Sequence, residues 1–458
     1  MLKKSLVDPL VRYKITMQSL EGLRSGEYRG TMRLKIPSGI ATFPREIFKL
    51  SRSLEILDLS GNSLLSELPS DFGRLHNLKI AFFSDCGFTA FPKQLAECRS
   101  LEMVAFKGNG MKTIPEGSLP PNLRWLILTN NLIDGLPRSI GQCHRLQKCM
   151  LAGNQLTSLP EEMANCKKLG LLRLSANKLE ELPAWLFTMP ELSFMAFAGN
   201  PCLQTETVVA NPVLSLIAWE ELQVKELLGE GASGVISRGL WTTSADSDAK
   251  QVAVKLFKGE VTSDGSPIDE MAACIAAGTH SNLISTIGKV HGHPNEQRGL
   301  VLELIPPHFE NLGLPPSLQT CTRDNFTPGK YFTIQKCKNI LVSIASAATH
   351  LHKTGITHGD LYAHNILIDE AGHALLGDFG AATVYSKTHG HSEAIEKLEV
   401  YAFGHLIEDM LSLLDPEVFG EKEAFIEEEL NELHYRCTRP VVKERPLFQE
   451  ILKELNGL

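Results

Sequence analysis

Three glycines near the middle of the chain have the spacing of a phosphate-binding loop. Gly229, Gly231 and Gly234 stand in the string GEGASGVI (229–236). Glycines at these positions let a strand, a turn and a second strand lie close to phosphate groups and offer backbone N–H groups without obstruction from side chains. Taken alone, such a string is equally typical of an ordinary glycine-rich turn. The strings that follow it along the chain decide its interpretation.

Three more strings follow in order: VAVK (252–255), HGDLYAHN (358–365) and DFG (378–380). One of the four strings alone carries little information, whereas all four in this order are specific. Together they resemble the glycine-rich loop, the phosphate lysine, the catalytic loop and the metal-binding triplet of the eukaryotic-type protein kinase family. The resemblance covers roughly residues 219–458.

The resemblance implies that ATP is the phosphate donor and assigns its contacts. Lys255 would bind the α- and β-phosphates, and it needs a carboxylate to hold it. Glu270 is the best candidate because it precedes an Ala-rich helical stretch, and Asp269 is the shorter-armed alternative. The string LVLELI (300–305) resembles the strand and hinge whose backbone groups contact adenine. The expected nucleotide-binding residues are Leu228, Gly229, Gly231, Gly234, Ile236, Lys255, Glu303 and Ile305.

The catalytic loop and the triplet imply the transfer chemistry. By resemblance, Asp360 orients and deprotonates the acceptor hydroxyl. Asn365 and Asp378 are the implied ligands of Mg²⁺, which neutralises charge on the β- and γ-phosphates. Together with Lys255 and Glu270, these three residues form the expected catalytic set.

Several positions depart from the family pattern. Gly359 replaces the arginine that usually pairs with a phosphorylated activation segment. A phosphate on that segment would therefore have no cation to pair with at this position. Tyr362 stands where Ser/Thr kinases usually have a lysine that touches the transferring phosphate, and a phenol without charge should slow transfer. About 20 residues, without an Ala-Pro-Glu string, separate Asp378 from Glu399, where the family usually has Asp. The platform that docks a peptide substrate is therefore expected to be short or absent.

A repeat pattern fills most of the first half of the chain. From about residue 36 to residue 202 the sequence repeats L-x-x-L-x-L-x-x-N-x-L. The asparagine position is occupied by Asn62, Cys86, Asn109, Asn131, Asn154, Asn177 and Asn200. Each repeat would contribute one short parallel strand, and stacking would make the leucine core continuous. The asparagines would satisfy backbone groups where the chain leaves the strand, so the turn with Cys86 should be looser.

These patterns predict a multidomain α/β plus α+β chain, in which a leucine-rich repeat solenoid precedes a bilobal protein-kinase fold. The expected boundaries are 1–35 for an N-terminal cap and 36–203 for the solenoid. Residues 204–218 would form a C-terminal cap or short linker, and residues 219–458 the kinase domain. The absence of a flexible Gly/Ser linker predicts two domains in a fairly fixed relation.

The concave face of the solenoid is predicted to bind a protein partner or substrate. Solenoid faces exposed to water are usually polar, whereas the ladders expected on this face are largely apolar, and a contiguous apolar patch usually marks an interface. The alternative is that the N-terminal segment or a kinase lobe covers the patch within the molecule. The expected partner-binding residues are Phe82, Trp125, Ile127, Met150 and Phe194.

The composition bounds the class of protein and its compartment. The 458 residues are 43% hydrophobic and 21% charged with a net charge of −8, which argues against disorder and against a dedicated nucleic-acid binder. No stretch approaches the length of an apolar membrane span. Ten cysteines without a CxxC pair are typical of reduced packing thiols, so a cytoplasmic location is expected.

The sequence therefore predicts an ATP-dependent protein kinase with a repeat domain that recruits proteins, Ser/Thr-specific by the base rate of the family. The alternative is a pseudokinase or weakly active kinase that serves as a protein-interaction scaffold. The presence of Lys255, Asp360, Asn365 and Asp378 favours activity, whereas the short activation segment favours weak transfer to external peptides. A third hypothesis is a structural repeat protein with a nucleotide-binding tail.

Overall fold

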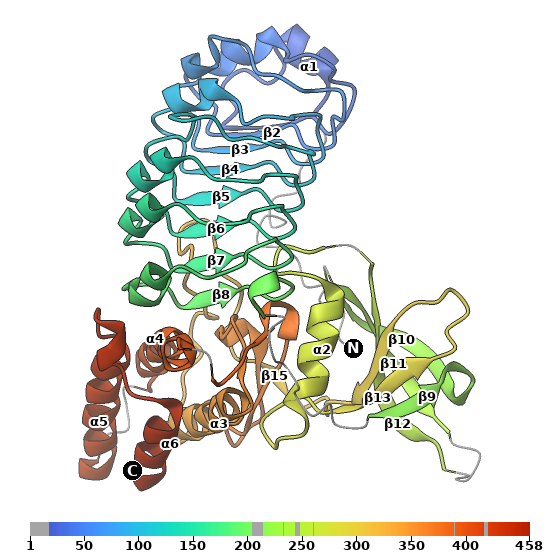
Figure 1. Cartoon of the computed structure of the whole chain (residues 1–458), viewed down its shortest axis with the longest axis vertical. Coiled ribbons are helices and arrows are strands. Elements are labelled where there is room, and N and C mark those ends of the chain that lie inside the picture. Colours follow the sequence, from blue (N-terminus) through green and yellow to red (C-terminus); the bar gives the residue numbers. More distant parts are fainter. Residues whose placement is uncertain are drawn as a thin grey trace.

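The computed structural model describes residues 18–203, 214–231, 233–242, 248–259, 261–388, 390–415 and 420–458. A stack of repeats leads into a two-lobed domain that packs against the β8 end of the stack (Figure 1). The predicted fold class is confirmed. None of the described helices is long and apolar enough to cross a membrane.

The repeat stack is built on a parallel sheet with one short strand per repeat. Its elements are α1 (Leu20–Ser25), β1 (Arg33–Lys35), β2 (Ile56–Asp58), β3 (Ile80–Phe82), β4 (Met103–Ala105), β5 (Trp125–Ile127), β6 (Lys148–Met150), β7 (Leu171–Arg173) and β8 (Phe194–Ala196). The strands lie in chain order with no register shift, so Ile56, Ile80 and Met103 begin one continuous ladder. The middle residue of every strand is buried, because side chains alternate and only the middle one faces the core.

Buried asparagines close most of the turns that follow the strands of the repeats. The Nδ2 of Asn154 donates to the carbonyls of Leu128 and Leu151 at 2.9 Å each, and its Oδ1 accepts from the amide of Ile133 at 3.1 Å. At the exceptional position, the Cys86 thiol reaches the Leu59 carbonyl at 3.3 Å, but it has no amide group to supply the remaining bonds. The side-chain amide of an asparagine thus ties two successive turns together.

The convex side consists of short 3-10 helices that follow prolines. They span Arg45–Leu50, Phe72–Arg74, Lys93–Glu97, Arg138–Gln142, Glu161–Asn165 and Ala184–Thr188. Proline precedes all of them except Phe72–Arg74, with φ between −66° and −68°. Proline holds φ near this value and has no N–H to satisfy, so it suits a turn into a helix.

Two predicted boundaries differ from the structure. Residues 33–35, placed in the N-terminal cap, form β1 and pair with β2. Residues 215–218, placed in the C-terminal cap or linker, form β9 and pair in parallel with β13 (Thr286–His291) of the two-lobed domain, because Ile217 fills the small core there. Within these two segments, residues 1–17 and 204–213 lie outside the described residues.

The two-lobed domain begins with a sheet in the order β10-β11-β12-β14-β13-β9. Its strands are β9 (Ser215–Ala218), β10 (Leu222–Glu230), β11 (Gly234–Trp241), β12 (Lys250–Phe257), β13 (Thr286–His291) and β14 (Gly299–Glu303), with helix α2 (Pro267–Ala277) beside them. This N-lobe leads into a mainly helical C-lobe. The C-lobe contains β15 (Glu310–Asn311), α3 (Ile334–Lys353), β16 (Ile356–Thr357), β17 (Ile366–Ile368), β18 (Ala374–Leu376), β19 (Thr383–Val384), α4 (Ser392–Ser412), α5 (Glu421–Cys437) and α6 (Phe448–Gly457).

The end of the concave face is covered inside the molecule. Phe194 is 3% exposed and belongs to the core of the C-lobe, against which Met150 also packs. The expectation that these two residues form a free partner surface is therefore wrong for this conformation, because the C-lobe occupies that surface. Phe82, Trp125 and Ile127, nearer the N-terminal end of the stack, remain half-buried.

The asparagine ladder yields a pair of opposite predictions for stability. Asn154→Ala should lower the free energy of unfolding by about 1–3 kcal/mol, because it leaves the buried amide of Ile133 without a partner and removes one of the two amide bonds at each of two buried carbonyls. Cys86→Asn should raise it by about 1 kcal/mol, because the amide restores bonds that the thiol cannot make. Urea unfolding followed by circular dichroism measures both changes. Equal effects of the two substitutions would contradict the role assigned to the ladder.

Candidate active site

The glycine-rich loop joins two antiparallel strands of the N-lobe. Gly229 of β10 pairs with Ile236 of β11. A Cβ on Gly229 or Gly231 would meet no atom within 4 Å, whereas one on Gly234 would lie 2.5 Å from the carbonyl oxygen of Leu256. Gly234 is therefore required by the packing of β11 on β12. The first two glycines leave the backbone of the loop open.

Lys255 and Glu270 form a buried ion pair between β12 and α2. The Lys255 Nζ bonds the Glu270 Oε1, and their side chains are 12% and 2% exposed. Ser266 caps α2 through the amide of Ile268, so the helix begins before Glu270 and carries it in its first turn. Burial lowers the pKa of the Lys255 amine, but the Glu270 carboxylate outweighs this effect and raises the pKa above its ordinary value. Glu270, and not Asp269, thus holds the lysine as a cation.

The remaining nucleotide candidates border the same sheet. Leu228 lies in β10 and is 46% exposed, while Ile236 lies opposite Gly229 in β11 and is half-buried. Glu303 ends β14, where it pairs with Val252, and Ile305 follows two residues later. Leu228 and Ile236 thus flank the glycine-rich loop, whereas Glu303 and Ile305 fit a hinge between the two lobes.

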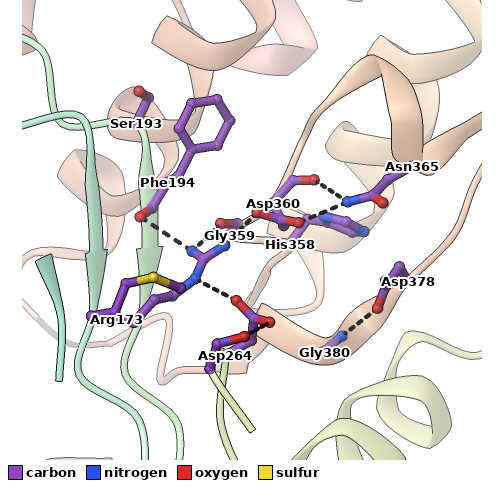
Figure 2. Close-up of polar contacts among 12 residues, drawn as sticks. Arg173, Ser193, Phe194, Asp264, His358, Gly359, Asp360, Asn365, Asp378 and Gly380 are labelled. Atoms are coloured by element: carbon purple, nitrogen blue, oxygen red, sulfur yellow. Dashed lines mark hydrogen bonds and ion pairs between the residues drawn. The ribbon is translucent and has the colours of Figure 1, made fainter. Parts of the chain in front are cut away.

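Asp360 accepts hydrogen bonds from its own loop and from the repeat domain. Its Oδ2 accepts from the Nδ2 of Asn365 at 2.8 Å, and its backbone carbonyl accepts from the same nitrogen at 3.0 Å. Its Oδ1 accepts from the Nη2 of Arg173, a residue of the repeat domain (Figure 2). Burial raises the pKa of Asp360, but the Arg173 guanidinium and neighbouring histidines outweigh it, and the net pKa is lowered. Both carboxylate oxygens are therefore engaged, and the group is held ionised.

Asp378 and Asn365 offer oxygen ligands in the same site as Asp360. Asp378 has φ 59° and ψ 83°, and its Oδ1 accepts from the amide of Gly380 at 3.1 Å. The hydrogen bonds of Asn365 to Asp360 use its Nδ2, so its Oδ1 is the atom suited to a metal. Among the described residues there is no cluster of three or more His, Cys, Asp or Glu side chains that could hold a metal unaided. The donor set fits a Mg²⁺ that completes its ligands with phosphate oxygens and water.

Glu399 of α4 anchors the backbone just before Asp360. Its Oε1 accepts from the amide of Gly359 at 2.6 Å and its Oε2 from the amide of His358 at 3.2 Å. The same Oε2 lies 2.7 Å from the Nε2 of His352. α4 begins at Ser392. Glu399 therefore projects from its second turn with fixed backbone geometry.

Sequence reasoning missed several residues that complete the site. Asp324, from the Pro-rich insert of residues 306–329, accepts from the amide of His364 at 3.1 Å and lies 2.8 Å from the His364 Nδ1. Arg173 also bonds Asp264, which precedes α2, at 2.7 Å. The signal available for Arg173 was its charge between Met150 and Ala196, in a ladder that is otherwise apolar from Phe82 onward.

Comparisons with known proteins agree with this architecture. Residues 222–403 match the family model of protein tyrosine and serine/threonine kinases. Residues 53–75 and 121–179 match leucine-rich repeat models. The matches lie on the two-lobed domain and on the repeat stack, respectively.

Similar proteins include kinases of both specificities. The probable serine/threonine-protein kinase gdt2 of Dictyostelium discoideum is 26% identical over 270 residues, 52% of this chain and 14% of that protein. A probable leucine-rich repeat receptor-like serine/threonine-protein kinase of Arabidopsis thaliana is 26% identical over 307 residues, 53% of this chain and 48% of that protein. The receptor tyrosine-protein kinase erbB-4 of Homo sapiens is 26% identical over 192 residues, 40% of this chain and 13% of that protein. The chain thus spans less than half the length of each of these relatives.

The anchoring role of Glu399 predicts a pH-dependent loss of stability. Glu399→Gln should lower the free energy of unfolding at pH 7 by about 1–3 kcal/mol, because an amide cannot accept all three bonds. Glu393→Gln is the control, since this side chain of the same helix is 67% exposed. A control that loses as much stability would contradict the assignment.

The sign of the pH dependence follows from the pKa of the group. Burial raises the pKa of Glu399, but its bonds with His352 and the loop amides outweigh this and lower it below 4.5. A lowered folded-state pKa contributes stability above the unfolded value that disappears as pH falls through the folded value. The difference between wild type and Glu399→Gln should therefore shrink below about pH 4.5.

Proposed function

Because the chain joins leucine-rich repeats to a protein kinase domain, we propose that it is an ATP-dependent protein kinase that phosphorylates Ser or Thr hydroxyls. The observation that carries the proposal is the pairing of Lys255 with Glu270 in the N-lobe together with the contact of Asp360 and Asn365 in the C-lobe. Two of the three kinases described above are Ser/Thr kinases, which supports that specificity over transfer to tyrosine.

Each residue of the expected catalytic set would have a separate role in phosphoryl transfer. Lys255, held as a cation by Glu270, would neutralise the α- and β-phosphates of ATP. Asn365 and Asp378 would ligate Mg²⁺, which supplies charge neutralisation at the phosphates when bound. Asp360 would orient the acceptor hydroxyl and take its proton. The transfer needs little covalent chemistry from the protein, so positioning and charge account for most of the catalysis.

A weakly active kinase or pseudokinase that serves as a scaffold is the second candidate function. Tyr362 occupies the position of the usual phosphate lysine, and its hydroxyl is buried without a hydrogen-bond partner. Its ring stacks on Phe194 with the centroids 3.9 Å apart. A buried neutral phenol adds no positive charge to the transition state, which favours slow transfer.

Recruitment of proteins by the repeats remains a proposal for the uncovered part of the concave face. Phe82, Trp125 and Ile127 lie on that part, whereas Met150 and Phe194 contact the kinase domain. A cytoplasmic location also remains a prediction from the cysteines, all ten of which are free.

The proposed roles predict loss of phosphotransfer without loss of fold. Lys255→Met, Asp360→Asn and Asp378→Asn should each reduce transfer from γ-labelled ATP by about 100-fold or more, because each removes a charge or proton acceptor from the reaction. Glu370→Gln, an exposed change between β17 and β18, is the control. Melting temperatures report folding. Wild-type turnover by Asp360→Asn would show that another group takes the proton.

Activity should not depend on phosphorylation of the activation segment. Gly359 provides no receiver for a phosphate, and two of the segment's hydroxyl groups are already occupied. The Thr383 Oγ1 accepts from the amide of Phe197 at 3.1 Å, and the Tyr385 hydroxyl lies 3.0 Å from the Nδ1 of His352. Phosphatase treatment, and the double change Ser386→Ala with Thr388→Ala, should leave the initial rate unchanged. A loss that rephosphorylation restores would refute this prediction.

A further inference from the structure

The repeat domain covers the side of the kinase domain from which a phosphate acceptor would approach Asp360. This side is the acceptor side. Phe194, the first residue of β8, lies flat on Tyr362, with an interplanar angle of 8° between the rings. Tyr362 is 5% exposed and follows Asp360 by two residues. A protein acceptor would have to reach Asp360 past these rings, so the covered surface lies where an acceptor must bind.

Arg173 fills the space directly at the Asp360 carboxylate. Its side chain is 1% exposed, yet its guanidinium is almost fully bonded. The Nη1 donates to the carbonyls of Gly359 at 2.8 Å and Phe194 at 3.3 Å, the Nη2 donates to Asp360, and the Nε donates to Asp264 at 2.7 Å (Figure 2). The Oδ1 of Asp360, which an acceptor hydroxyl would use, is thereby bonded to a cation. The other hydrogen bonds of Arg173 hold that cation in place.

The glycine at position 359 is fitted to this contact. Gly359 has φ +70°, and a Cβ there would lie 2.7 Å from the carbonyl oxygens of both Met195 and Ala381. Met195 belongs to β8 of the repeat domain. The arginine that the family usually carries at this position could not be accommodated while the repeat domain is docked. The glycine at position 359, which departs from the family pattern, is therefore the residue that the docked arrangement requires.

The nucleotide side of the site is assembled in the same structure. The ion pair of Lys255 and Glu270 is formed, and Asp378 lies beside Gly380 with its carboxylate bonded to that amide. The repeat domain reaches the N-lobe through Asp264 and through close packing of Gly153 on Val261. Arg173 thus bridges Asp264 before α2 and Asp360 of the C-lobe, and it ties the two lobes together.

We propose that the repeat domain holds the kinase domain in an autoinhibited state, in which Arg173 and Phe194 occupy the acceptor side of Asp360 while the nucleotide side stays assembled. The proposal rests on the proposed kinase function. Release of the repeat domain from the C-lobe frees the Asp360 carboxylate and exposes the ring of Tyr362. The repeats then act as an internal lid on the kinase domain in addition to any recruitment.

Substitutions at the contact should activate the full-length protein. Arg173→Ala should raise phosphorylation of myelin basic protein, used as a generic acceptor, by about tenfold or more, because the closed state loses its central ion pairs. Asp264→Asn removes one of these pairs from a side chain that is 30% exposed, so it should activate less and fold normally. Arg138→Ala, at an 82% exposed repeat residue, is the control and should have no effect. The affinity for Mg·ADP, measured by calorimetry, should stay unchanged in all three variants.

A reversible cross-link provides a second, independent test. A Cβ on Gly170 would lie 3.8 Å from the Cβ of Thr322, which is within the range of a disulfide. Gly170→Cys with Thr322→Cys, added to Asp264→Asn, should return transfer to the wild-type rate when oxidised and release it again on reduction. Each single cysteine variant is the control, since Cys321 lies next to the engineered position. Activation that persists in the oxidised, cross-linked protein would overturn the proposal.

The outcomes separate this inference from the proposed function. A fall in transfer in folded Arg173→Ala would show that Arg173 assists the reaction and would overturn the autoinhibited state. A wild type that transfers phosphate but gains nothing from either substitution would refute the inference alone. A protein that transfers phosphate in none of these forms, although it binds Mg·ADP, would refute the proposed function and the inference with it.

Discussion

The buried guanidinium of Arg173 is the interaction on which the arrangement of the two domains depends. A charge that is removed from water is strongly unfavourable unless it is paired and hydrogen-bonded. Arg173 meets this requirement only where β7, the Asp264 segment and the catalytic loop come together. Separation of the domains would leave Asp360 without this partner and return the arginine to solvent. The pairing therefore fixes orientation, while the apolar contacts around it supply most of the adhesion.

Those apolar contacts merge the two domains into one continuous core. Tyr385, Ile395, Leu398 and Val442 of the C-lobe are buried within the core of the repeats. Arg445, which is 2% exposed, donates to the Pro190 carbonyl of the repeat domain at 2.6 Å. The repeats thus pack on the segment that follows β19 through Tyr385 and on α4 through Ile395 and Leu398.

The nucleotide side has its own support within the kinase domain. The pair of Lys255 and Glu270 depends on β12 and α2, and the catalytic loop depends on Glu399 of α4 and on Asp324 of the insert. None of these contacts involves a repeat residue. The structure therefore separates the groups that would hold a nucleotide from the groups that control access of an acceptor.

The sequence by itself determined the repeat period, the strand register and the order of the kinase strings, and it narrowed the carboxylate partner of Lys255 to Glu270 or Asp269. These features follow from local periodicity and from residues close together along the chain, for which side-chain alternation and helix spacing are sufficient. Only the tertiary structure decided that β9 joins the N-lobe, that Phe194 lies on Tyr362, and that Arg173 pairs with Asp360. Arg173 and Asp360 are separated by 187 residues. No local pattern encodes such a contact, because it depends on how two finished surfaces fit together.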